Sequence, residues 1–327
     1  MVKLWCMKRL SFFWAATVLL VAGCTPQQSD ESIPSAAPAT KGKPTIALVM
    51  KSLANEFFKT MEEGATKHQQ AHAQQYTLLA NGTKDEQDIA KQQQLVEQMV
   101  SQKVGAIVIA PTDSKAMVPI CKKAQDAGIV VVNIDNRFDE GVLKEKSASI
   151  AFVGPDNRKG AKLAGEFLAK KLKAGDKVAV LEGIPTAFNG QQRKAGFEDA
   201  MKAAGIEIVA SQSANWETDQ ASKIAGALLT AHPEVKALLC ANDSMALGAV
   251  AAIKAAGKAG QILVIGFDAI GAVRALVKSG TILCTVDQHA DQLAVLGIEY
   301  ALEMLSKKSA PASKETPVDL VTVDTLR

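Results

Sequence analysis

The sequence from Leu238 to Gly248, LLCANDSMALG, decides the fold class. It begins with an apolar run, stops at Asn242, Asp243 and Ser244, and continues with small residues that favour a helix. Asn, Asp and Ser cap helix N-termini, so the segment predicts a buried strand that turns into a helix. Polar side chains and free backbone N–H groups then gather at the carboxyl end of a strand, which is where open α/β sheets bind ligands.

The same alternation of strand and helix recurs along the whole chain. A first series predicts strands at 45–50, 76–80, 106–110, 129–134 and 150–153, with helices at 56–74, 85–102 and up to 127. A second series predicts strands at 177–181, 207–210, 237–241, 262–266, 281–286 and 318–323, with helices at 157–173, 188–204, 217–231, 243–256, 270–278 and 290–306. Continuous apolar strands alternating with helices indicate parallel sheets covered on both faces. We expect an α/β protein with two Rossmann-like lobes, two parallel sheets of similar size and a ligand cleft between them.

The first 43 residues have the pattern of a targeting segment followed by a tether. Three basic residues precede the apolar run 10–22, which is shorter than the ~20 apolar residues that span a bilayer. Small residues before Cys24 and a Ser/Pro/Ala/Gln tract after it resemble a bacterial lipoprotein signal peptide at 1–23 and a flexible tether at 24–43. The mature chain then begins at a lipid-bearing Cys24 in the periplasm or cell envelope. An ordinary cleaved signal or an uncleaved anchor is the alternative.

Composition is that of a globular protein without a nucleic-acid-binding surface. The chain has 327 residues, 48% of them apolar, and a formal net charge of +3, with no basic cluster among aromatic residues. Cys121, Cys240 and Cys284 lie in apolar or helix-like segments, so we expect buried thiols, with a disulfide left open. Neither a metal site nor a cofactor is expected.

Polar residues follow most of the predicted strands. They are Asn55, Thr112-Asp113, Asp135-Asn136, Asp156-Asn157, Asn242-Asp243, Asp268 and Asp287-Gln288, and Phe57-Phe58, Trp216 and Phe267 stand beside them. Short amide and carboxylate side chains suit a neutral polyhydroxyl ligand, and aromatic rings can lie against the C–H faces of a sugar. Each polar residue alone is more often a helix cap, and each Phe alone is more often core. Their combination favours a binding site, because caps require no neighbouring aromatic rings.

The chain resembles the periplasmic substrate-binding proteins and lipoproteins of sugar ABC importers, in particular the ribose-binding-like group of the type I fold. The resemblance runs from about Thr45 to Thr325. It is carried by NEFF at 55–58, PTDS at 111–114, ID at 134–135, ANW at 214–216, ANDSMALG at 241–248, GFD at 266–268 and TVDQ at 285–288. It implies two lobes joined by three crossovers that close on a sugar as a hinge. The implied N-terminal lobe is 44–155 with 289–319, and the C-terminal lobe is 156–288 with 320–327.

The resemblance also implies the ligand-binding residues. In the N-terminal lobe, hydroxyl groups are bound by Asn55 and Asp135, and stacking is provided by Phe57 and Phe58. In the C-terminal lobe, stacking is provided by Trp216, and hydrogen bonds are made by Asn242, Asp268 and Gln288. The wall of the site is lined by Phe267. Within the opening segment we expect Asn242 to contact the ligand and Asp243 to cap its helix.

Several positions depart from the ribose-binding pattern. Lys51 replaces a small hydroxyl residue, Ala110 replaces an Asn, Asn136 replaces an Arg, and Gln191 stands where a sugar-binding Arg is expected, with Arg193 two residues on. These changes remove or relocate charged hydrogen bonds to the ligand, each worth about 1.5–3 kcal/mol. They therefore argue against ribose itself as the ligand. Lys51 has two interpretations: it bonds a ligand oxygen, or it pairs with Asp135 and organises the site.

The leading hypothesis is a monomeric binding protein that captures a pentose, hexose or polyol and delivers it to a membrane permease with its ATPase. The alternative is a receptor that presents a sugar or autoinducer-like signal to a membrane kinase or chemoreceptor. A transcription regulator of this fold is disfavoured, because a secretion signal stands where a DNA-binding segment is expected. An enzyme is not expected, because no GxGxxG follows a strand, no GxxxxGK[ST] occurs and no nucleophile and base can be paired.

Overall fold

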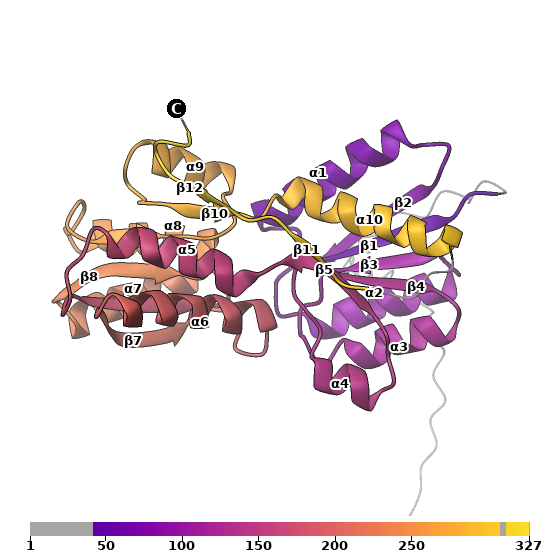
Figure 1. Ribbon diagram of the computed structural model, residues 1–327, viewed down its shortest axis with the longest axis horizontal. Coiled ribbons are helices and arrows are strands. Elements are labelled where there is room, and N and C mark those ends of the chain that lie inside the picture. Colours follow the sequence, from indigo (N-terminus) through magenta and orange to yellow (C-terminus); the bar gives the residue numbers. More distant parts are fainter. Residues whose placement is uncertain (1–41, 308–311, 327) are drawn as a thin grey trace, which may run out of the picture. The chain divides into compact units, whose positions relative to one another are not determined.

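The computed structural model describes residues 42–307 and 312–326 of the chain (Figure 1). One sheet has six parallel strands in the spatial order β11 (Lys314–Thr316), β5 (Ala151–Pro155), β4 (Val130–Ile134), β3 (Ala106–Ile109), β1 (Thr45–Ser52) and β2 (Thr77–Thr83). The helices that accompany this sheet are α1 (Glu56–Ala71), α2 (Ile89–Ser101), α3 (Val118–Asp126), α4 (Glu140–Glu145) and α10 (Ala290–Lys307). We call this group of elements the N-lobe.

The remaining elements form the C-lobe. A four-stranded parallel sheet has the order β7 (Glu207–Ser213), β6 (Lys177–Glu182), β8 (Val235–Cys240) and β9 (Leu263–Ile265), and an antiparallel pair consists of β10 (Thr285–Asp287) and β12 (Asp319–Val321). Its helices are α5 (Asn157–Ala169), α6 (Phe188–Ala203), α7 (Thr218–Ala231), α8 (Asp243–Ala255) and α9 (Gly271–Lys278).

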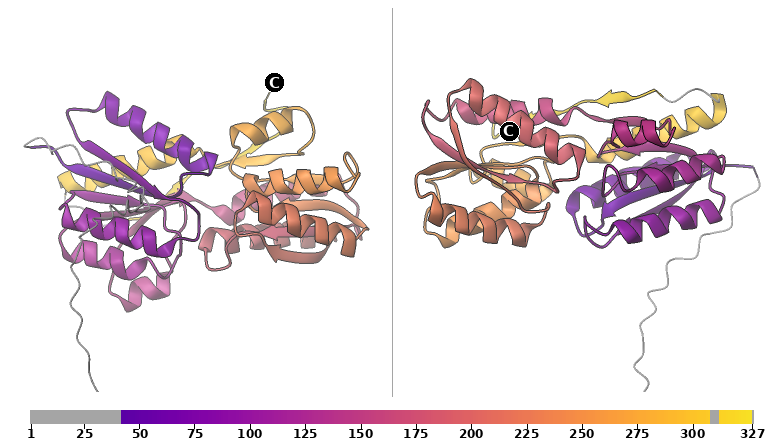
Figure 2. Two further views of the ribbon diagram at one scale, coloured as in Figure 1. Left: turned by 180° about the vertical axis from the view of Figure 1, so that it is seen from behind. Right: turned by 90° about the horizontal axis from the view of Figure 1, so that it is seen from below.

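Helices cover both faces of the N-lobe sheet, as the views in Figures 1 and 2 show. Side chains alternate between the two faces of a strand, and β1 follows this rule. Ile46, Leu48 and Met50 belong to the apolar cluster that includes residues of α1 and α10. Ala47 and Val49 belong to the cluster that includes residues of α2 and α3. Burial on both faces explains why this strand is a continuous apolar run in the sequence.

The chain passes between the lobes three times, which agrees with the expected three crossovers. It leaves the N-lobe after β5, returns after β10, and leaves again between β11 and β12. Strand β11 lies parallel beside β5 (Figures 1 and 2). Neither lobe is therefore a single continuous stretch of sequence.

The structure corrects the prediction of two similar sheets. The C-lobe sheet has four strands against six, because the strand predicted at 281–286 is displaced: β10 pairs antiparallel with β12, and Cys284 makes only an isolated bridge to Ile265. Two short elements, α4 and β11, were not predicted. Both are exposed along much of their length, so neither has the apolar pattern by which a buried element is recognised.

Candidate functional site

A cavity of about 230 Å³ is lined by side chains from both lobes. The N-lobe contributes Lys51 from β1, Asn55, Phe57 and Phe58 from the start of α1, Glu86 after β2 and Asp135 after β4; the C-lobe contributes Asn189 and Arg193 from α6, Trp216 after β7, Asn242 after β8 and Asp268 after β9. They converge because the carboxyl ends of parallel strands meet at one edge of a sheet.

The N-lobe wall is built around the ammonium group of Lys51. Lys51 Nζ lies 3.1 Å from Asp135 Oδ2 and 3.8 Å from Glu86 Oε2, and all three side chains are almost completely buried. Glu86 Oε1 accepts a hydrogen bond from Asn55 Nδ2 at 2.8 Å. Asn55 Oδ1 caps α1 by accepting from the N–H of Phe57 at 3.0 Å. This wall is thus a connected network in which each polar side chain is held by another.

The C-lobe wall is built around the guanidinium group of Arg193. Arg193 Nε donates to Asn157 Oδ1 at 2.8 Å, and Nη1 donates to the carbonyl of Ala241 at 2.9 Å and faces Asp268 Oδ1 at 3.4 Å. The guanidinium carbon lies 3.8 Å from the ring centroid of Phe267, a cation–π contact. The planar guanidinium group therefore joins α6 to the residues that follow β5, β8 and β9.

Burial raises the pKa of two carboxyl groups in the wall. The pKa of Glu86 rises to about 7, because burial outweighs the stabilising effect of the neighbouring cation and amide. The pKa of Asp268 also rises to about 7, because burial outweighs the charge of Arg193. With Asp135, three carboxyl groups face two cations in the wall. Such a wall suits an uncharged ligand whose hydroxyl groups both donate and accept.

Aromatic rings complete the cavity on both sides. Phe57 and Phe58 meet edge to face with centroids 5.1 Å apart, and Lys51 Nζ lies 5.8 Å from the ring centroid of Phe58. From the C-lobe, the indole of Trp216 packs so closely on Gly183 that an added Cβ there would lie 2.0 Å from the ring. Both sides thus offer flat apolar surface among polar groups, an arrangement that fits the two faces of a sugar ring.

The capping role predicted for Asp243 belongs instead to Asn242. Asn242 Oδ1 accepts from the N–H of Met245 at 2.9 Å at the start of α8, and its Nδ2 donates to the carbonyl of Trp216 at 3.3 Å. Asp243 is fully buried and accepts from Thr285 Oγ1 at 2.8 Å and from the N–H of Ile270 at 2.9 Å. Burial, and then the charge of Asp268, raises the pKa of Asp243 well above its ordinary value. Asp243 therefore joins neighbouring strand ends, while Asn242 caps the helix and lines the cavity.

Four predicted site residues do not line this cavity. Gln191 is exposed and donates to the carbonyl of Pro185 at 2.8 Å, because it lies on the outer face of α6 while Arg193 points inward. The other three, all buried, support lining residues from behind: Asn136 accepts from the N–H of Asn189, Phe267 lies against Arg193, and Gln288 donates to Asp268.

Two lining residues, Glu86 and Asn189, were not predicted. The strand before Glu86 extends to Thr83, three residues beyond the predicted end at 80, and Glu86 falls inside the helix predicted at 85–102. Asn189 lies in the first turn of α6, seven residues after β6 ends at Glu182. Neither residue directly follows a strand end, so the pattern of polar residues after strands does not include them.

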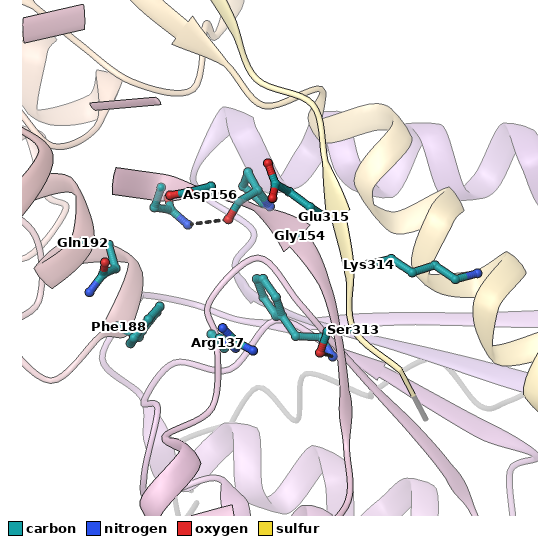
Figure 3. A pocket seen from close by; sticks show the side chains of 11 residues that line it. Arg137, Gly154, Asp156, Phe188, Gln192, Ser313, Lys314 and Glu315 are labelled. Carbon is teal, nitrogen blue, oxygen red and sulfur yellow. Dashed lines mark hydrogen bonds between the residues drawn. The ribbon is translucent and has the colours of Figure 1, made fainter. Parts of the chain in front are cut away.

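A second cavity, of about 870 Å³, lies at the crossing segments, and Figure 3 shows Arg137, Phe188, Gln192 and Ser313 around it. Its charged groups already have partners: Arg137 pairs with Glu140 at 3.1 Å, and Glu315 with Lys159 at 3.7 Å. No residue that lines it is among those with a buried polar side-chain atom lacking a partner in the described part of the chain. The smaller cavity has two such residues, Asp135 and Trp216, and is the better candidate for a ligand site.

The described residues are 42–307 and 312–326. In these ranges no three His, Cys, Asp or Glu side chains are grouped so that they could hold a metal ion. No described helix combines the length and hydropathy needed to cross a membrane. Cys121, Cys240 and Cys284 are buried free thiols, and burial raises the pKa of all three.

The sequence matches the model of a protein family described as periplasmic binding protein domain over residues 46–309. The D-ribose/D-allose-binding protein of Pseudomonas aeruginosa is 57% identical over 287 residues, which cover 86% of this chain and 90% of the relative. The ribose import binding protein of Escherichia coli is 34% identical, with 85% and 90% covered.

Solved structures agree with this match. An ABC transporter solute-binding protein from Burkholderia multivorans, with an unknown ligand interpreted as α-D-erythrofuranose, has a TM-score of 0.84 and 56% identity, covering 86% of this chain and 100% of the other. A periplasmic solute-binding protein from Actinobacillus succinogenes with bound D-allose has a TM-score of 0.83 and 38% identity, covering 87% and 99%.

Proposed function

Because this chain belongs to the family of periplasmic binding protein domains, we propose that it captures a monosaccharide or related polyol between its lobes and delivers it to the permease of an ABC importer. One observation carries the proposal: the cavity wall combines buried carboxyl and amide groups with aromatic rings from both lobes. The names of the relatives support import rather than sensing. The role is one of binding and not of catalysis.

Binding follows from the two walls. Hydroxyl groups of the ligand hydrogen-bond to Asp135 and Asp268, while Phe57 and Trp216 lie against its C–H faces. The hinge is made by the three crossings, with an N-terminal lobe of 44–155 and 289–319 and a C-terminal lobe of 156–288 and 320–327. Closure around the ligand excludes water, and a missing or inverted hydroxyl leaves buried polar groups unpaired.

Lys51 serves chiefly to organise the N-lobe wall in this proposal. Its ammonium group lies within 4 Å of carboxylate oxygens of both Asp135 and Glu86, so it fixes their separation. An ammonium group has three donors, and the one that remains can reach a ligand oxygen. The two interpretations of Lys51 are thereby compatible.

The family is that of periplasmic binding proteins, and we propose that this chain is attached to a membrane by lipid. Residues 1–41 lie outside the described residues, so the lipoprotein signal rests on the sequence around Cys24. We expect a monomer anchored by lipid on Cys24. Mass spectrometry of the purified membrane-bound protein should show acyl chains on that residue and no residues before it, and Cys24→Ala should lose the acyl chains. A wild-type protein without acyl chains on Cys24 would contradict the anchor.

Calorimetry over a panel of pentoses, hexoses and polyols tests the function, with D-ribose and D-allose included because relatives are named for them. We expect saturable one-to-one binding of at least one sugar. Asp135→Asn should weaken it at least tenfold, because a charged hydrogen bond worth about 1.5–3 kcal/mol is lost. The control is Asp126→Asn, which changes an exposed carboxylate paired with Lys122 and should leave binding unchanged. If no sugar of the panel binds, the proposed function is wrong.

A further inference from the structure

Trp216 is held in an uncommon backbone conformation beside the cavity. Its φ is +70° and that of Asn215 is +51°, so two consecutive non-glycine residues are left-handed. Such residues are uncommon and persist where surrounding contacts hold them. Asn215 is held here by its side chain, which accepts from Ser213 Oγ at 3.1 Å and donates to Gln220 at 2.9 Å. The turn after β7 is thus specified in detail, and the side chain that it places in the cavity wall is the indole.

The indole ring itself has little freedom to turn. Its six-membered ring lies against the backbone at Gly183 and Gly190, where an added Cβ would come within 2.0 Å and 3.1 Å of ring carbons. The carbonyl of Trp216 is held by the amide of Asn242. Because glycine at these positions allows a close approach, the ring is packed in one orientation.

The N–H group of this ring has no hydrogen-bond acceptor among the described residues, although Trp216 is only 3% exposed. A buried donor is normally paired, because removing it from water without a partner is unfavourable. The ring cannot turn to find an acceptor elsewhere, and Trp216 lines the cavity. A phenylalanine would supply the same stacking surface without this unfavourable term. The choice of tryptophan therefore points to an acceptor that arrives with the ligand.

We propose that the Trp216 N–H, which points along the plane of its ring, donates a hydrogen bond to a hydroxyl group that extends past the ring edge of the stacked sugar, and so selects for ligands that carry that hydroxyl. This inference rests on the proposed function and goes beyond stacking. The N-lobe wall offers the matching acceptor: Asp135 Oδ2 is buried and, within the described residues, makes no hydrogen bond of good geometry, although Lys51 Nζ faces it at 3.1 Å. Only a group that accepts on one side and donates on another satisfies both walls, and a hydroxyl group does so.

The test combines Trp216→Phe with monodeoxy analogues of whichever sugar the wild-type protein binds most tightly. The variant should bind the parent sugar about tenfold more weakly, the value of one buried hydrogen bond. One monodeoxy analogue should bind the wild-type protein correspondingly weakly and lose nothing further in the variant. All other analogues should show the full tenfold effect of the substitution.

A spectroscopic measurement on the wild-type protein tests the same hydrogen bond even if Trp216→Phe is less stable than the wild type. Trp5 and Trp14 lie in the expected signal segment, so the mature chain has one indole N–H resonance, that of Trp216, and it disappears in Trp216→Phe. It should move downfield with the parent sugar and not with the selected analogue.

Equal affinities of wild type and variant for the parent sugar would overturn the inference. An equal loss for every analogue, with no downfield shift, would also overturn it and leave only a packing role for the ring. Either result still leaves a sugar-binding protein. If the wild-type protein binds no sugar, the proposed function falls first and this inference falls with it.

Discussion

Asn242 both caps helix α8 and supports the C-lobe wall of the cavity. Its Oδ1 caps α8 and its Nδ2 holds the carbonyl of Trp216, so the two ends of the amide serve different purposes. We expect Asn242→Ala to lower the free energy of unfolding by about 1 kcal/mol through the lost cap, and to weaken sugar binding as well. Urea unfolding measures the first effect and calorimetry the second.

The control for this prediction is Asn242→Ser. Serine also caps helices well, so this variant should recover most of the stability. It has no amide to hold Trp216, so sugar affinity should stay low. Recovery of both properties together would show that the amide contact to Trp216 is unimportant for binding.

Glu86 should make the stability of the folded protein with its lobes together depend on pH. Its pKa rises from 4.5 to about 7 on folding, so the folded protein holds this proton more tightly than the unfolded chain. The protonated carboxyl contributes stability that is complete below pH 4.5 and is lost as the pH rises through about 7, to a total of about 3 kcal/mol. Between pH 5 and pH 8 the wild type should lose more free energy of unfolding than Glu86→Gln does. Parallel profiles would contradict this, and exposed Glu97→Gln should follow the wild type.

At the scale of elements, α6 begins without a cap of its own. Its N-cap is Ala187, and acceptors from the N-lobe serve its first N–H groups: Ser114 Oγ for Phe188 at 2.9 Å and Asn136 Oδ1 for Asn189 at 3.2 Å. Helix α9 is similar, since the N–H of Gly271 donates to Glu56 Oε1 of the N-lobe at 2.8 Å. The N-lobe thus completes two helices of the C-lobe when the lobes are together.

Ser114→Ala should therefore weaken sugar binding, although Ser114 does not line the cavity. Losing the hydrogen bond to Phe188 disfavours the closed form by about 1 kcal/mol, which is about fivefold in the dissociation constant. Calorimetry measures the effect. Ser306→Ala removes an exposed hydroxyl that bonds only within its own helix, so it should change nothing. An unchanged dissociation constant for Ser114→Ala would show that closure does not depend on this contact.

The sequence predicted the elements that have strong apolar patterns. It did not predict those whose position depends on pairing with a distant strand. Strand β1 and helices α8 and α10 fall within two residues of their predicted ends, because their burial appears directly in the sequence. Strand β10 was misplaced, because its partner β12 lies 32 residues further on and no local pattern indicates that pairing. In the site, the resemblance indicated Asn242 and Trp216. The sequence did not indicate that Asn242 caps α8, that it also contacts Trp216, or that Glu86 lines the cavity. These features depend on tertiary packing, which spacing along one chain does not reveal.

At the scale of the whole molecule, the three crossings tie the stability of one lobe to the other. Helix α10 follows a C-lobe strand yet packs in the N-lobe, where Gly297 approaches Ile134 and Val108 so closely that an added Cβ would clash with both. Strand β11 likewise comes from the end of the chain and completes the edge of the N-lobe sheet. The segment that contains α10 and β11 is connected at both ends to C-lobe strands, β10 before it and β12 after it. The N-lobe therefore cannot unfold alone without pulling on both strands.

We therefore expect the lobes to unfold in one cooperative transition. Tyr76 and Tyr300 belong to the N-lobe and Trp216 to the C-lobe, so tyrosine and tryptophan signals report on different lobes. Trp5 and Trp14 lie in the expected signal segment, so Trp216 is the one tryptophan of the mature chain. Coincident urea transitions indicate a single unit, and two separate midpoints would contradict it. A sugar at one hundred times its dissociation constant should stabilise both signals equally, by about 2.7 kcal/mol, because it binds only when both walls are folded. A shift confined to the tryptophan signal would mean that the C-lobe binds alone.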